Sequence, residues 1–291
     1  MTADTFWALL GFGIITGSVT ALAATGLTLL LGITKFLNFA YGEWLTIAAF
    51  VTLAVNVTLD LPLLVAVFAA VLFLAVFGPL ANRIVFKPLT GRSPLTLLVT
   101  AIGLSFVLRN IVQAIWGTDV QRLVIPSFLF EPVSFGPFTL TTLNVLVIVI
   151  SLIAMVALAA LLNTTKLGRG MRAMADNPDL AQASGIPIDR VNMWTWVLGS
   201  ILGALAGVML AMTTQLSPNM GFLQLLVIAS AVIVGGLGNV YGAVLAAFLI
   251  GISMELSTAF IDPSLKPGVA FLLLILVLLY RPQGLLGKVV G

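Results

Sequence analysis

The sequence predicts an all-α integral membrane protein, a polytopic bundle of eight or nine transmembrane helices that carries a short helical segment on its cytoplasmic side. Of the 291 residues, 60% are hydrophobic and 8% are charged. The mean hydropathy is +1.20, whereas in soluble domains only about half of the residues are apolar. Several apolar runs reach the roughly twenty residues that cross a bilayer. Because hydrocarbon offers no partner to backbone amides, such runs must form helices.

The apolar runs place the candidate spans in order along the chain. They are 6–31, 41–59, 62–82, 94–116, 139–162, 193–214, 221–237, 240–258 and 268–280. The run 221–258 contains GGLGNVYG, which fits either a turn between two spans or a break within re-entrant segments, so the count is eight or nine. Asp4 precedes the first run and no basic residue comes before Lys35, a flank unlike that of a cleavable signal peptide, so this run is expected to be retained.

Basic residues are distributed unevenly over a nine-span topology. One side holds ten of them, Lys35, Arg83, Lys87, Arg92, Lys166, Arg169, Arg172, Arg190, Arg281 and Lys288, while Arg109, Arg122 and Lys266 lie at or near the other. Because basic loops favour the cytoplasm, we expect an external N-terminus and a cytoplasmic C-terminus. The chain 1–291 is then one transmembrane domain with an irregular external loop at 117–138, rich in Pro, Gly and Phe, and a cytoplasmic loop at 163–192.

The composition excludes several kinds of chemistry. The chain has no cysteine and no histidine, which removes thiol chemistry, disulfides, the usual metal sites and the commonest general base. No GxxxxGK[ST] phosphate loop occurs, and GGLGN at 235–239 lacks the preceding strand of a dinucleotide site. We expect no bound cofactor, no metal, no nucleic acid and no enzymatic activity.

Small residues at helical spacing predict close helix packing. Gly199, Gly203 and Gly207 recur every fourth residue and so share one helix face. Gly235, Gly236 and Gly238 of the GGLGN segment are expected to form a tight turn or a close helix contact.

Polar residues interrupt the apolar sequence in KFLNFAYGEWL, residues 35–45. They are Asn38, Tyr41, Gly42 and Glu43. An ionisable group at membrane depth usually faces a cavity, a pathway or a partner, and broken helices form substrate sites in transporters. The alternative is a turn at the inner surface, with Glu43 near a helix N-terminus that favours an anion. Arg109 and Glu255 lie near predicted outer ends and are expected to extend to the interface.

Residues 166–191, KLGRGMRAMADNPDLAQASGIPIDRV, hold seven of the chain's charges. Asn177 suits a helix N-cap, Pro178 the first helical position and Asp179 the positive end of the helix dipole, while Gly185 can end the helix. Upstream, Arg169 and Arg172 lie three apart on nearly one helix face, with Asp176 following. Such capped helices form either a rigid projection for a soluble partner or an amphipathic loop on the headgroups.

The chain resembles the permease subunits of branched-chain amino acid ABC transporters, specifically the H-type. RAMADNPDLAQASGIPIDRV is similar to their cytoplasmic coupling loop, and GITKFLNFAYGEWLTIAAF to their segment ending in Asn-Phe-Ala-His-Gly-Glu. VIVGGLGNVYGAVLAAFLIG resembles their glycine-rich late span, and LLILVLLYRPQGLLGK their C-terminal signature. These ordered matches extend over most of the sequence.

The resemblance implies an importer in the cytoplasmic (inner) membrane of a prokaryote. A second, identical or related permease subunit would complete the path, and two cytoplasmic ATPase subunits, which use ATP and Mg²⁺, would bind the coupling loop. An extracytoplasmic substrate-binding protein would deliver the substrate. Arg169, Arg172, Asp176, Asn177, Asp179 and Gly185 are the expected coupling residues.

Two departures from the family pattern leave the substrate open. Tyr41 stands where the family usually has His, and Tyr241 where it often has Pro. The substrate is therefore a branched-chain or other aliphatic amino acid, or alternatively urea or a short-chain amide. A self-contained carrier or channel is the alternative from another class, although it would need more coupling residues inside the membrane.

Overall fold

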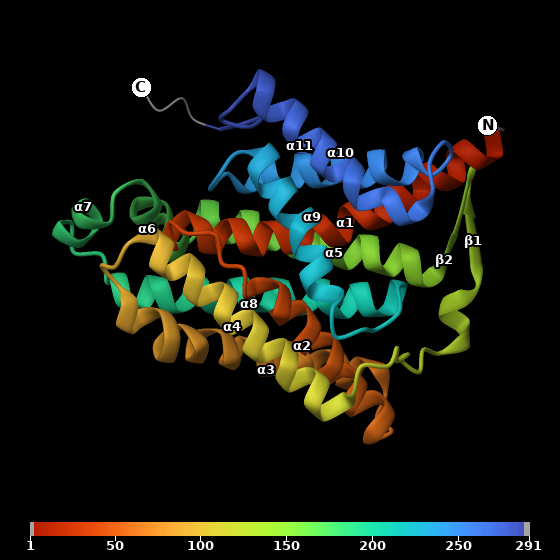
Figure 1. The fold of residues 1–291 in the computed structure, drawn as a ribbon, viewed down its shortest axis with the longest axis horizontal. Helices are drawn as coiled ribbons and strands as arrows, with labels where there is room; N and C mark the ends of the chain where they lie inside the picture. The colour runs from red at the N-terminus through yellow and green to blue at the C-terminus, as the bar shows by residue number, and fades with distance from the viewer. Residues whose placement is uncertain (1–2, 288–291) are drawn as a thin grey trace.

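The computed structural model describes residues 3–287, except for the side chain of Phe135, and shows a bundle of helices elongated along one axis (Figure 1). The helices are α1 Ala3–Thr34, α2 Tyr41–Leu53, α3 Leu63–Ala81, α4 Pro94–Trp116, α5 Thr142–Thr164, α6 Lys166–Asp176, α7 Pro178–Ala183, α8 Ile188–Thr213, α9 Met220–Gly235, α10 Val240–Ser257 and α11 Lys266–Tyr280. Helix α2 continues into a π-helical turn, Ala54–Thr58, and α3 into another, Asn82–Phe86.

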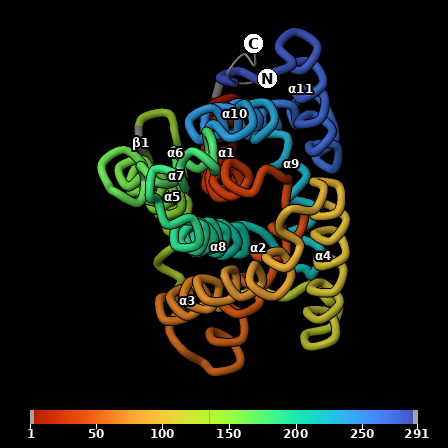
Figure 2. The backbone as a smooth tube through the Cα atoms, turned by 90° about the vertical axis from the view of Figure 1, so that its left-hand side faces the viewer, coloured from red at the N-terminus to blue at the C-terminus, as the bar shows by residue number. Residues whose placement is uncertain are grey.

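Helix α1 forms the centre of the bundle. In the end view it is surrounded by α5, α8, α9 and α10, while α3, α4 and α11 lie at the periphery (Figure 2). In its most apolar stretch 89% of the residues are buried, against 6% in that of α11. A helix that is apolar on all sides is either buried in protein or faces lipid. Helix α1 is the buried case, and the exposed apolar surface of α11 is of the kind that faces lipid.

The membrane character of the fold is confirmed. Seven helices between residues 3 and 287 are long and apolar enough to cross a bilayer, and α9 is a shorter apolar helix of 16 residues. Each of the nine predicted spans corresponds to a helix, although the number that crosses the membrane stays a prediction. GGLGN lies in the turn between Gly235 and Val240, so 221–258 forms two separate helices.

The loop 117–138 is more ordered than the sequence suggested. It contains a 3₁₀ turn, Ser127–Phe130, and strand β1, Pro132–Phe135, which pairs antiparallel with β2, Phe138–Thr141. The two residues between the strands include Gly136 with a φ of +60°, a conformation that glycine adopts readily. The prediction of an irregular cap was therefore wrong for this part, and α5 begins at Thr142 rather than 139.

Helices α6 and α7 lie at one end of the long axis and the β1–β2 hairpin at the other (Figure 1). We call the end with α6 and α7 the basic end, because Lys35 and Lys87 lie there. Lys35 donates a hydrogen bond to the Ala175 carbonyl, and Lys87 pairs with Asp189 at 2.9 Å. Lys288 lies outside the described residues.

Candidate translocation site

The chain between α1 and α2 turns back into the bundle. Helix α1 ends at Thr34, and Lys35 takes a positive φ of 58° that changes the direction of the backbone. The side chain of Asn38 is buried, and its Oδ1 accepts a hydrogen bond from the backbone N–H of Ala40 at 3.0 Å. This contact organises the tight turn from which α2 starts at Tyr41.

Tyr41 shows how deep this start lies. Its ring is fully buried against α8 beside Gly203, and its hydroxyl donates to the Gly199 carbonyl at 3.2 Å. Gly199 lies 11 residues after Ile188, the first residue of α8, which is about 17 Å along a helix that rises about 1.5 Å per residue. Helix α2 thus begins inside the bundle, and not in a turn at its surface.

The first turn of α9 meets the first turn of α2. A Cβ added to Gly221 would lie 2.0 Å from the carbonyl oxygen of Gly42, so the two backbones touch. The Gly221 N–H donates to the Thr46 hydroxyl at 3.1 Å. Interrupted helices whose ends meet inside the membrane are typical of transporter substrate sites, because their free backbone groups can face a ligand.

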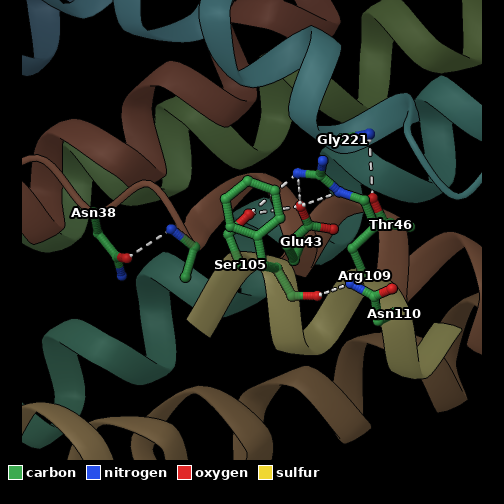
Figure 3. Close-up of polar contacts among 9 residues, drawn as sticks. Asn38, Glu43, Thr46, Ser105, Arg109, Asn110 and Gly221 are labelled. Atoms are coloured by element: carbon green, nitrogen blue, oxygen red, sulfur yellow. Dashed lines mark hydrogen bonds and ion pairs between the residues drawn. The ribbon is translucent and has the colours of Figure 1, made fainter. Parts of the chain in front are cut away.

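Glu43 is the charged residue at this crossing, and its counter-ion comes from α4 (Figure 3). The carboxylate is fully buried. Its Oε1 accepts from Arg109 Nη2 at 2.7 Å, from Arg109 Nε at 3.2 Å and from the Ser105 hydroxyl at 2.8 Å. A buried charge is tolerated only when it is paired and hydrogen-bonded, and this arrangement supplies both.

Aromatic rings complete the surroundings of Arg109. Its guanidinium carbon lies 4.2 Å from the ring centroid of Phe222 on α9 and 5.5 Å from that of Phe106. The expectation that Arg109 extends to the interface was wrong, because Glu43 attracts it inward. Two buried atoms near this crossing, Glu43 Oε2 and Asn38 Nδ2, have no hydrogen-bond partner among the described residues.

A second, partly buried ion pair joins α10 to α11. Glu255 of α10 accepts from the Thr16 hydroxyl at 3.0 Å and from Lys266 Nζ at 2.7 Å. Glu255 lies near the end of α10, as expected, and Lys266 at the start of α11 is its counter-ion; its extension to the interface stays a prediction. Between residues 3 and 287 there is no cluster of three acidic, His or Cys residues that could hold a metal.

The glycines singled out in the sequence lie at close helix contacts or turns. A Cβ would meet Leu30 at 2.8 Å from Gly199, the Tyr41 ring at 3.1 Å from Gly203 and the Leu45 carbonyl oxygen at 2.3 Å from Gly207. Gly235 contacts the backbone of Gly242, while Gly236 and Gly238 have positive φ values in the turn that follows α9.

The polar loop forms α6 and α7 at the basic end. The Thr165 hydroxyl caps α6, and Asn177 Oδ1 caps α7 by accepting from the backbone N–H groups of Asp179 and Leu180, both at 3.1 Å. Gly185 has a φ of +79° after α7. The predicted caps of α7 are therefore present, because they depend only on neighbouring residues.

The arginines of α6 donate hydrogen bonds to the last turn of α5. Arg172 donates to the Leu162 carbonyl at 2.7 Å and to Asn163 Oδ1 at 3.1 Å, and Arg169 to the Thr164 carbonyl at 3.5 Å. These bonds fix α6 against the last turn of α5. Leu180 was not among the residues that the sequence predicted for contact with a partner. It is 65% exposed near the start of α7, and an apolar residue in a polar, capped helix is a signal that the sequence itself contains.

Comparisons of the whole chain with known proteins identify its family. The family described as the permease component of the branched-chain amino acid transport system matches residues 9–278. The high-affinity branched-chain amino acid transport permease BraD of Pseudomonas aeruginosa is 33% identical, and LivH of Escherichia coli 32% identical, each over 95% of this chain and 94% of its own length.

A solved structure shares the fold. The chain from PsaBC of Streptococcus pneumoniae, determined in complex with a Fab, superposes with a TM-score of 0.52 at 14% identity, over 94% of this chain and 92% of that one. At this identity the likeness concerns the fold alone. From the family match and the full-length relatives, this chain belongs to the family of branched-chain amino acid transport permeases.

Proposed function

We propose that this chain is the membrane-spanning permease subunit of an ATP-driven ABC importer for branched-chain amino acids. The observation that supports it best is the full-length similarity to BraD and LivH, whose names give this substrate class. The apolar interior of the bundle suits an aliphatic side chain. The catalytic step, ATP hydrolysis with Mg²⁺, belongs in this proposal to two partner ATPase subunits.

The crossing of α2 and α9 is the proposed translocation site. Asn38, Tyr41, Gly42 and Glu43 are buried at or beside it, and the Glu43–Arg109 pair links α2 to α4. A helix start inside the membrane provides backbone groups for a polar solute. An α-amino acid carries an ammonium and a carboxylate group. This crossing holds the Glu43 carboxylate and the Arg109 guanidinium next to apolar side chains.

Helices α6 and α7 are the proposed coupling segment. They project from the end of the bundle (Figure 1), α7 is capped at both ends, and Leu180 is an exposed apolar contact on it. Closure of the ATPase subunits around nucleotide would move this rigid projection and, through α5 and α8, shift the bundle between outward and inward access. This requires that the nucleotide favour one conformation, since a ligand shifts an equilibrium only by differential affinity.

The remaining assembly follows from the same proposal. The basic end faces the cytoplasm, as its positive residues favour, and the hairpin end faces the substrate-binding protein. A second permease subunit, identical or related, completes the path in the prokaryotic inner membrane.

Uptake in cells tests the substrate class. A bacterial strain without its own branched-chain amino acid uptake is given this chain together with the ATPase, permease and binding-protein subunits of its source organism, and labelled leucine and urea are supplied separately. We expect leucine uptake that disappears when this chain is omitted. Uptake of urea without leucine would instead support the urea or amide permease alternative.

A further inference from the structure

A groove at the basic end separates the last turns of α3 from the first turns of α8. It has a volume of about 440 Å³, and its walls include Val76, Leu80, Arg83, Lys87, Asp189 and Asn192. None of these residues belongs to the proposed translocation site or to α6 and α7. The groove is therefore a separate feature of the surface.

The helix length places the groove at the level of the lipid headgroups. The apolar segment of α3 and its continuation runs from Leu63 to Leu89, 27 residues. At about 1.5 Å per residue, roughly twenty residues cross the hydrocarbon core of about 30 Å, so Arg83 and Lys87 lie just beyond it. Trp194 on α8, 39% exposed, is the kind of side chain that is enriched at this interface.

The groove carries a net positive charge. Lys87 pairs with Asp189 at 2.9 Å, but both side chains are more than half exposed, and such exposed pairs contribute little. Arg83 is exposed and has no ion pair among the described residues. One guanidinium is thus available, and the ammonium group of Lys87 can be shared with a second anion.

The polarity of the groove changes along the membrane normal. Val76 is 63% and Leu80 48% exposed on the side toward the hydrocarbon, and the charged residues follow toward the end of the helix. A phospholipid has the same order, with acyl chains below and an anionic headgroup above.

We propose that this groove binds an anionic phospholipid, with phosphatidylglycerol as the ligand. Its phosphate pairs with Arg83 and shares Lys87, and its acyl chains lie along Val76 and Leu80. Basic pockets between membrane helices on the cytoplasmic side bind anionic headgroups in this manner. The site requires only that the chain spans a membrane, so it does not depend on the transported substrate.

Lipid retention on the purified full-length chain tests this site. The chain is incubated in detergent with equal amounts of phosphatidylglycerol and phosphatidylcholine that carry the same acyl chains, and bound lipid is counted by native mass spectrometry. We expect phosphatidylglycerol to be retained at least fivefold over phosphatidylcholine. Arg83→Gln should reduce this preference to less than twofold, while the size-exclusion profile shows that the variant is folded.

The matched control is Arg92→Gln, which removes the same charge at the same end but outside the groove. It should keep the preference. Equal loss in both variants would show diffuse attraction to basic residues and would overturn the proposal, as would full retention in Arg83→Gln. Displacement of the bound lipid by soluble glycerol phosphate at equal concentration would identify a site for free phosphate and would also contradict it.

Discussion

Arg109 of α4 reaches Glu43 of α2 across the bundle interior, with its Nη2 2.7 Å from the carboxylate Oε1. The two residues are 66 positions apart in the sequence. Their contact attaches the peripheral helix α4 to the point where α2 starts inside the bundle.

Glu43→Gln tests the pair. Removing one partner leaves Arg109 with a buried, uncompensated charge, which costs about 3–5 kcal/mol of unfolding free energy. We expect lower thermal stability and at least tenfold lower leucine uptake at normal expression. Glu255→Gln, in the partly buried pair with Lys266, is the control and should lower thermal stability without a comparable loss of leucine uptake at normal expression.

The double variant Glu43→Gln with Arg109→Gln separates stability from transport. Because it removes both charges, most of the lost stability should return, as neutral replacement of a buried ion pair is often harmless. Uptake should stay low, since the polar groups at the path are changed. Recovery of uptake along with stability would reduce the pair to a structural contact.

Gly207→Ala tests the close approach of α8 to α2. The new Cβ would lie 2.3 Å from the Leu45 carbonyl oxygen, and overpacking of this kind costs about 1–3 kcal/mol. Gly103→Ala is the control, because nothing lies within 4 Å of its added Cβ. It should leave thermal stability unchanged or raise it by about 0.5–1 kcal/mol. Equal effects of the two substitutions would contradict the packing described.

Leu180→Asp tests the proposed coupling segment. Leu180 is 65% exposed, so the substitution should not disturb folding, but it places a charge on the surface proposed to contact the ATPase. We expect at least a fivefold drop in copurified ATPase. Leu237→Asp, equally exposed in the turn between α9 and α10, should retain the ATPase; undiminished copurification with Leu180→Asp would argue against docking on α7.

Asp262, in the connection from α10 to α11, gives a prediction on pH. The Ser264 backbone N–H donates to its carboxylate at 2.8 Å, and hydrogen bonding to Ser264 holds the pKa of Asp262 below its usual value. A lowered pKa in the folded state stabilises the turn above the unfolded pKa of about 3.9, and this contribution is lost as the pH falls through the folded pKa. Hydrogen exchange at the Ser264 amide should lose protection at acid pH, and Asp262→Asn should abolish this dependence.

Local signals explain which parts of the structure the sequence could predict. The apolar runs correspond to helices because each satisfies its own backbone. Asn177 and Gly185 were recognised because a cap involves only residues within one turn. The family resemblance on the motifs around Glu43 and Asp179 was confirmed by the full-length comparisons.

Contacts between distant segments explain the rest. Nothing near Arg109 in the sequence reveals that Glu43 lies within its reach. The sequence therefore predicted that Arg109 extends to the interface. Phe222 joins the same cluster only because α9 begins beside α2. The β1–β2 hairpin was missed because its strands have four residues each, too short for an alternating pattern to be distinguished from a loop.

The most direct test of the central claim is leucine accumulation in lipid vesicles. The chain is reconstituted with its permease partner, its ATPase subunits and the binding protein, and in parallel alone. The account predicts accumulation against a gradient only in the complete assembly with ATP and Mg²⁺ inside the compartment that holds the ATPases. Concentration of leucine by the chain alone, without nucleotide, would contradict it.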